Sequence, residues 1–279
     1  MTDKINLTRP EKVNLANNPT LTEKLVKKIA KLHKNYELEF LKDRIGLKHV
    51  YLTNPKDALF FILSFSFYQG RRDELSQQFE EKTKNTLEQF FKNNNTFLSN
   101  SRLRITDKND LKKEYTQLHK KLKENEVNKE NDRLMVISLI NLIQSKSEKN
   151  ILKFIIAKIK SNKISEAYKI LDSVWSIGPK IASLILRDII YIYELEEYLN
   201  KPKNEPNDYC FLQPIDTWVH KVSHEIGVIG NKKIYKDEAK DITDKCFEFD
   251  VNPIHYNQGA WYIGANSWQV LLRNIEVIK

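Results

Sequence analysis

The segment from Leu171 to Tyr191 holds the residues whose types and spacing are best suited to chemistry. Two apolar stretches flank a tight turn, Ser176-Ile177-Gly178-Pro179. Gly178 permits a positive φ, and Pro179 presets the first turn of a following helix. The turn therefore presents backbone N–H groups at a helix N-terminus, where a DNA phosphate can bind. An ordinary helical hairpin would show the same pattern, so the turn alone leaves both interpretations open.

The charged residues near this segment have ordinary explanations when each is taken singly. Lys180 is typical of a solvated helix lysine, and Asp216 is typical of a helix N-cap. Arg187 could contact a base or a phosphate, although a salt bridge would explain it equally well. His220 and His224 have the spacing of two metal ligands on a helix, but no third ligand and no HExxH frame accompany them. We therefore expect no metal site.

Two motifs, in the correct order, resemble the helix-hairpin-helix DNA glycosylases. Residues 176–182 (SIGPKIA) are similar to their hairpin, Pro-Gly-Val-Gly-x-Lys-x-Ala, with Ser176 in place of the first hairpin glycine. Residues 212–219 (LQPIDTWV) are similar to their Val-Asp-x-x-Val motif. The resemblance implies that Lys180 is the nucleophile of a bifunctional enzyme and that Asp216 is its catalytic aspartate.

One branch of this superfamily, the archaeal 8-oxoguanine DNA glycosylases, is the most similar. That branch also has a longer gap between the two motifs, which an insertion at about 193–211 would explain here. Residues 252–264 (NPIHYNQGAWYIG) resemble its Pro-Pro-Leu-His-Leu-Asp…Leu-Trp-Leu-Leu-Gly segment. With weaker similarity at 62–74 and 97–104, the resemblance extends from about Asp57 to Gly264.

The same resemblance implies a pocket for a flipped base, in which Trp261 stacks on the base and Asn257 bonds its edge. Asn257 stands where the branch usually has an aspartate, and an amide can donate as well as accept, so the lesion could differ. An aromatic residue of the branch is also replaced by Leu184, and Trp261 could instead be a core residue. Six residues are expected in this pocket: Trp261, Asn257, Leu184, Arg187, Ser66 and Gln69.

The implied reaction is excision of a damaged base from double-stranded DNA, and 8-oxoguanine is the expected substrate. After the nucleotide is extruded, a neutral amine at Lys180 would attack the sugar C1′ and form a Schiff base that permits β-elimination. Asp216 would deprotonate the lysine or stabilise the cationic sugar. Two alternatives stay open: a monofunctional glycosylase for alkylated or deaminated bases, and a non-catalytic helix-hairpin-helix DNA-binding protein.

The composition agrees with a polyanionic partner. Lys and Arg number 46 against 37 Asp and Glu, for a net charge of +9, although a Lys-rich genome would produce the same excess. The only cysteines, Cys210 and Cys246, exclude a four-thiolate zinc or iron–sulfur site, and we expect no cofactor. The polar N-terminus and the lack of a membrane-length apolar run predict a cytoplasmic protein without a membrane partner. We expect a monomer.

Helical periodicity dominates the chain and predicts an all-α, two-lobed helix-hairpin-helix glycosylase fold. A first helix is expected from Leu21 to Leu41, with Thr20 or Thr22 as its N-cap, and Asn54-Pro55 should start another. One lobe is expected to contain residues 1–58 and 172–279, the other residues 59–171. The active-site cleft should lie between them.

Overall fold

Helices account for all regular secondary structure in the part of the chain that the structure describes. The structure is a computed structural model, and it describes residues 19–68, 73–200, 207–230 and 235–266. The predicted all-α class is confirmed. Among the described helices, none combines the length and the apolar character needed to cross a membrane.

The first part of the chain is a helical path interrupted by one π-helical turn. The expected single helix over 21–41 is wrong, because the chain divides there into shorter pieces. Thr22 does not cap a helix, since its hydroxyl donates to the carbonyl of Ile226 at 2.9 Å. Asn54 caps as expected, accepting from Lys56 N at 2.9 Å, with Pro55 in the first turn. The elements are α1 (Pro19–Lys31), α2 (His33–Tyr36), the π-helical turn η2 (Glu37–Leu41), α3 (Lys42–Gly46), α4 (Lys48–Thr53), α5 (Pro55–Ser66) and α6 (Asp73–Asn93).

The middle of the chain packs around two largely buried helices, α5 and α9. All residues from Asp132 to Gln144 are buried in α9, and all from Ala58 to Ser66 except Phe60 are buried in α5. Asn150 caps α10 by accepting from Leu152 N and Lys153 N. The elements here are the 3₁₀ turn η3 (Phe97–Ser99), α7 (Lys108–Glu114), α8 (Thr116–Glu124), α9 (Glu130–Gln144), α10 (Ile151–Lys160) and α11 (Ile164–Asp172).

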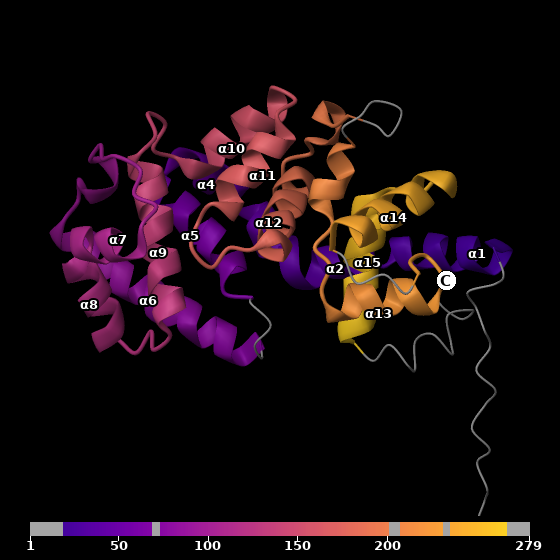
Figure 1. Cartoon of the computed structure of the whole chain (residues 1–279), viewed down its shortest axis with the longest axis horizontal. Helices are drawn as coiled ribbons and strands as arrows, with labels where there is room; N and C mark the ends of the chain where they lie inside the picture. The colour runs from indigo at the N-terminus through magenta and orange to yellow at the C-terminus, as the bar shows by residue number, and fades with distance from the viewer. Residues whose placement is uncertain (1–18, 69–72, 201–206, 231–234, 267–279) are drawn as a thin grey trace, which may run out of the picture.

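The last part of the chain returns to the first. Helix α15 packs against α1, α2 and α13, so the two ends of the described chain lie side by side (Figure 1). Gly259 allows this close approach, since a Cβ there would collide with the backbone carbonyl of Ile29. The elements are α12 (Pro179–Ile192), the 3₁₀ turns η4 (Glu196–Tyr198) and η5 (Asp208–Leu212), α13 (Thr217–Glu225), α14 (Tyr235–Glu248) and α15 (Pro253–Ala265).

Among the described residues, buried apolar side chains form two hydrophobic cores. The larger one draws on residues from Tyr36 to Leu212, together with Ile254. The smaller one draws on α1, α13, α14 and α15. Trp261 and Tyr262 pack against both cores, so α15 runs along their junction.

The cores divide the chain at other places than the expected lobes. The hairpin helix α12 was expected with the C-terminal helices, but its buried face belongs to the larger core, alongside α5 and α11. The segment from Tyr36 to Ala58 also contributes to the larger core. Because a core is not a lobe, the two-lobed division stays a prediction.

Candidate active site

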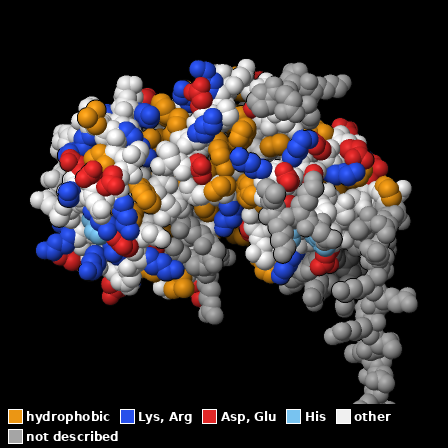
Figure 2. Space-filling view, viewed as in Figure 1, with side chains coloured by type: hydrophobic (Ala, Val, Ile, Leu, Met, Phe, Trp, Pro, Cys, Tyr) orange, Lys and Arg blue, Asp and Glu red, His pale blue; other side chains and the backbone are white. Residues whose placement is uncertain are grey.

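A cavity of about 760 Å³ lies where the two cores meet. It is bordered by the η2–α3 segment, the end of α5, the first half of α12, the start of α13 and the end of α15. On the face shown in Figure 2, the outline is indented between the part that carries α6 and the part that carries α13. The described residues that border the cavity are Tyr36, Phe40, Arg44, Phe65, Tyr68, Lys180, Leu184, Arg187, Pro214, Ile215, Asp216, Thr217, Trp218, Lys221, Trp261 and Ala265.

Lys180 and Asp216, far apart in sequence, both border this cavity. Lys180 is the second residue of α12, at the N-terminus of the helix. Its Nζ donates to the carbonyl of Tyr68 at 3.0 Å, which directs the side chain toward the end of α5. The fold therefore brings the two predicted catalytic residues to one site.

Asp216 is held by the backbone of the helix that follows it. As N-cap of α13 it accepts from Trp218 N at 2.9 Å and Val219 N at 2.8 Å, both at Oδ1. The cap interpretation and the catalytic interpretation are thus compatible, because one carboxylate oxygen satisfies the helix. Capping also fixes the direction in which the carboxylate faces the cavity.

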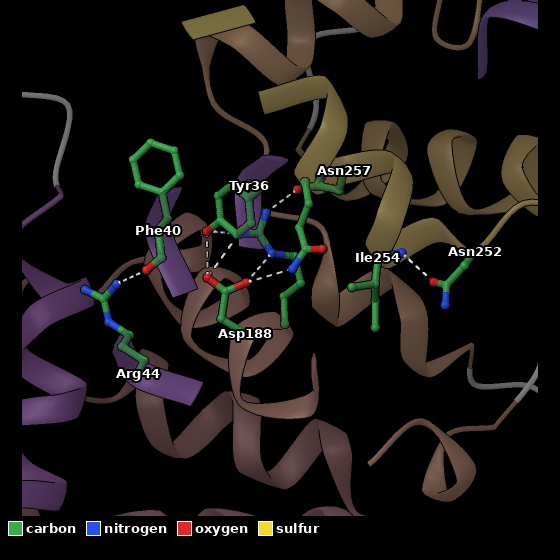
Figure 3. A network of polar contacts seen from close by, with 9 residues as sticks. Tyr36, Phe40, Arg44, Asp188, Asn252, Ile254 and Asn257 are labelled. Carbon is green, nitrogen blue, oxygen red and sulfur yellow. Dashed lines mark hydrogen bonds and ion pairs between the residues drawn. The ribbon is translucent and has the colours of Figure 1, made fainter. Parts of the chain in front are cut away.

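Arg187 borders the cavity but is only 1% exposed, and it is bound by buried polar groups. Its Nε donates to Asp188 Oδ1 at 2.8 Å, its Nη1 to Asn257 Oδ1 at 2.7 Å and its Nη2 to the Tyr36 hydroxyl at 2.6 Å. The Tyr36 hydroxyl in turn donates to Asp188 Oδ2 at 2.8 Å (Figure 3). The salt bridge that the sequence left open as an explanation of Arg187 is therefore present.

Burial and charge act in opposite directions on this network. Burial is the largest single effect and lowers the pKa of Arg187, but the charge of Asp188 and its hydrogen bond, together with Tyr36 and Asp216, outweigh it, so the pKa is raised. Burial raises the pKa of Tyr36, which stays a neutral hydrogen-bond donor. Arg187 is thus permanently charged, and its charge is paired with that of Asp188 inside the protein.

Aromatic rings form another part of the cavity wall. Trp261, partly buried on α15, meets Tyr36 edge to face at 5.7 Å and Phe40 at 4.8 Å between ring centroids. In an α-helix, steps of four residues drift by about 40° around the axis. The π turn between Tyr36 and Arg44 has more residues per turn and offsets that drift, so Tyr36, Phe40 and Arg44 all reach the cavity.

Arg44 is seated against this wall by neutral groups. Its guanidinium carbon lies 4.5 Å from the centre of the Phe65 ring. Nη1 donates to the carbonyl of Phe40, while Nε and Nη2 donate to Ser64 Oγ at 3.3 and 3.2 Å. Arg44 is partly exposed, in contrast to Arg187.

Only some of the predicted base-pocket residues border the cavity. Trp261, Leu184 and Arg187 border the cavity, as does the lysine–aspartate pair. Asn257 does not border the cavity. It is fully buried, and its side-chain carbonyl oxygen accepts a hydrogen bond from Arg187. Ser66 is also fully buried away from the cavity, with its hydroxyl donating to Ile62 O. Gln69 lies outside the described residues.

The hairpin turn differs in detail from its predicted conformation. The positive φ, 63°, is at Ser176, whereas Gly178 has φ −93° and is the N-cap of α12. Pro179 occupies the first turn as expected, and Ile177 is buried. A Cβ at Gly178 would meet no atom within 4 Å, so the glycine leaves the surface there open rather than permitting a strained turn.

This turn borders a second, shallower hollow of about 620 Å³. Trp175 lies in it with 38% of its surface exposed, and its Nε1 donates to Thr106 O at 3.3 Å. Arg104 braces the same region by donating to Ser138 O and Ser173 O. The turn is therefore held rigidly while its outer face stays accessible.

The two histidines with metal-like spacing have other contacts. His220 and His224 lie 6.1 Å apart between ring centroids, and His220 Nδ1 is 3.1 Å from Glu238. Within the described ranges, no group of three or more His, Cys, Asp or Glu side chains could hold a metal ion.

Sequence reasoning missed Tyr36, Phe40, Arg44 and the rim residues Trp218 and Lys221. The four-residue spacing of the first three was visible, but nothing local showed that the face they share meets a hairpin far along the chain.

Comparison with known proteins adds no relative: no family model, no curated protein and no solved structure matches this chain.

Proposed function

We propose that this protein is a DNA glycosylase with AP lyase activity, acting on a damaged base through Lys180 and Asp216. The observation that carries the proposal is that both residues border one cavity, together with aromatic rings. Taken singly, a helix lysine and a capping aspartate would mean little. Their convergence, on motifs that resemble those of the helix-hairpin-helix glycosylases, supports a joint role.

The cavity suits a flipped nucleotide in size and lining. Its volume of about 760 Å³ is within the range of small-molecule sites. Trp261 and Phe40 offer flat apolar surface to a base, and stacking of this kind contributes roughly 1–3 kcal/mol per base. A base can reach such a site only after leaving the duplex.

The chemistry follows from the two side chains. The neutral amine of Lys180 attacks C1′, the C1′–N bond breaks, and its electron pair leaves with the base. The carboxylate of Asp216 stabilises the positive charge that develops on the sugar. Ring opening gives a Schiff base between Lys180 and C1′, and loss of a proton from C2′ expels the 3′ phosphate by β-elimination.

The hairpin supplies the contact to the DNA backbone in this proposal. The turn of residues 176–178, with its open face and the helix N-terminus behind it, offers N–H groups to a phosphate. A net charge of +9 supports attraction to DNA at long range.

The proposal is tested with duplexes that each carry one defined lesion, followed by borohydride trapping. The wild-type protein should form a covalent adduct, with 8-oxoguanine the expected substrate. Lys180→Gln should abolish the adduct, and Asp216→Asn should keep DNA binding but slow base release severely. Lys153→Gln, an exposed lysine on α10, is the matched control and should behave as wild type.

Three outcomes separate the alternatives. Base release without a trapped adduct would identify a monofunctional glycosylase. DNA binding without release of any base would identify a binding protein. An adduct that survives Lys180→Gln would show that another amine is the nucleophile.

A further inference from the structure

The charged side chains around the cavity are unequal in sign. Among the described residues, four are basic, namely Arg44, Lys180, Arg187 and Lys221, and one is acidic, Asp216. Asp188 neutralises Arg187 from behind the wall. The remaining balance is positive, and Arg44 holds that charge on the aromatic side of the cavity, where a base would stack.

Arg44 is held in place by neutral hydrogen-bond partners, and its charge also acts on the carboxyl group of Glu80. Phe65 covers one face of its guanidinium, and its bonds go to a backbone carbonyl and a hydroxyl, which carry no charge. Within the described residues, no carboxylate forms an ion pair with it. These bonds use three of its five N–H groups, since Nη1 and Nη2 each carry two.

We propose that Arg44 reads the carbonyl-bearing edge of the flipped base and stabilises that base as it leaves. The inference rests on the proposed glycosylase function and names its substrate class: neutral bases rich in carbonyl oxygens, such as oxidised or deaminated bases. Arginine has donors only, so it suits carbonyl acceptors and disfavours an exocyclic amine in the same place.

The charge argument concerns the bond that breaks. A neutral base leaves as an anion, because the electron pair of the C1′–N bond goes to the ring and is delocalised onto its carbonyl oxygens. A guanidinium held beside those oxygens before the reaction lowers the barrier without reorganising. The base later takes a proton from water.

Purines alkylated at N3 or N7 behave in the opposite way. They already carry a positive charge and leave as neutral molecules, so Arg44 offers their departure no stabilisation. The same charge opposes their entry into the cavity. The structure therefore favours oxidised or deaminated bases over cationic alkylated ones.

The test compares Arg44→Gln and Arg44→Lys with wild type in single-turnover release of 8-oxoguanine and hypoxanthine. Arg44→Gln should slow release of whichever neutral base is the substrate by on the order of 10- to 100-fold, with little change in affinity for the duplex. Arg44→Lys keeps the positive charge but loses the forked donors of the guanidinium, so its rate of base release should be intermediate. Lys42→Gln, exposed on the same helix and outside the cavity, removes the same charge and should match wild type.

A preformed abasic site separates this inference from the function on which it rests. Such a site has no base to expel, so Arg44→Gln should form the borohydride-trapped adduct there at the wild-type rate, which also shows that it is folded. Failure of the wild-type protein to form that adduct would overturn the lyase proposal itself. Equal losses on abasic and base-containing duplexes, or an unchanged rate of base release, would overturn the role of Arg44. So would faster wild-type release of 7-methylguanine than of the neutral bases.

Discussion

Two arginines border the same cavity under opposite conditions. Arg187 is buried, paired with the carboxylate of Asp188 and bonded to Asn257 and Tyr36. Arg44 is partly exposed and bonded only to neutral oxygens among the described residues. In Figure 3 the bonds of Tyr36, Asp188 and Asn257 form one connected group, and Arg44 and Phe40 form another beside it.

The difference shows which arginine can act on a ligand. The donors of Arg187 are directed to groups of the protein itself, so its contribution is to hold α2, α12 and α15 together behind the wall. Arg44 has a fixed position, and no carboxylate among the described residues forms an ion pair with it, so a ligand can satisfy its charge. Proximity to a cavity therefore identifies a functional residue less well than the charge and hydrogen bonds it has left to offer.

The largest expected effect is that of Asp188→Asn. It leaves the Arg187 charge buried without its counter-ion, and breaking a buried pair in this way costs about 3–5 kcal/mol. Denaturant unfolding followed by circular dichroism would measure the loss. Asp110→Asn, an exposed carboxylate on α7, should leave stability unchanged. A loss at position 188 no larger than that of this control would mean that the network is not buried as described.

A smaller loss is expected for Asn257→Ala. The change deprives Arg187 Nη1 of its acceptor, and losing a hydrogen bond to a charged group costs about 1.5–3 kcal/mol. Adduct formation at an abasic site should persist once unfolding is taken into account, since Asn257 does not border the cavity. If the change abolished lesion discrimination while stability stayed at the wild-type level, Asn257 would be a base-contacting residue after all.

The smallest effect on stability is expected for Arg44→Gln, at less than about 1 kcal/mol, because its bonds are partly exposed. The loss of the Arg44 charge should instead change the pKa of Glu80. Burial raises the pKa of Glu80 to about 6, and the positive charge of Arg44 opposes that rise. Removing the charge should raise the pKa further, which NMR titration of the carboxyl would detect.

The raised pKa of Glu80 determines how the free energy of unfolding changes with pH. The folded state prefers the protonated carboxyl of Glu80, so this contribution is present below its ordinary pKa of 4.5 and is lost as the pH rises through about 6. Arg44→Gln should move the upper end of this window to higher pH. An unshifted titration would mean that the two groups do not sense each other.

Parts of the site were predictable because their causes are local. Asp216 lies at a helix start and bonds the amides two and three residues ahead, and Pro179 opens α12 as its ring geometry favours. The position of positive φ was not predictable from glycine preference alone, because Ser176 adopts it while Gly178 stays extended. Asn257 was predicted to lie in the base pocket because its spacing from Trp261 suggested a shared helix face. Its side chain instead bonds to Arg187.

The sequence by itself determined the all-helical class, the hairpin with Lys180 at the head of α12, and the capping aspartate that follows. These depend on periodicity, on proline and on hydrogen bonds between near neighbours. Only the tertiary structure decided that a π-helical turn lets Phe40 and Arg44 border the same cavity as Lys180, and that Arg187 has a carboxylate ion pair whereas Arg44 has none among the described residues. Such pairings depend on contacts between segments distant in sequence, which no local pattern encodes.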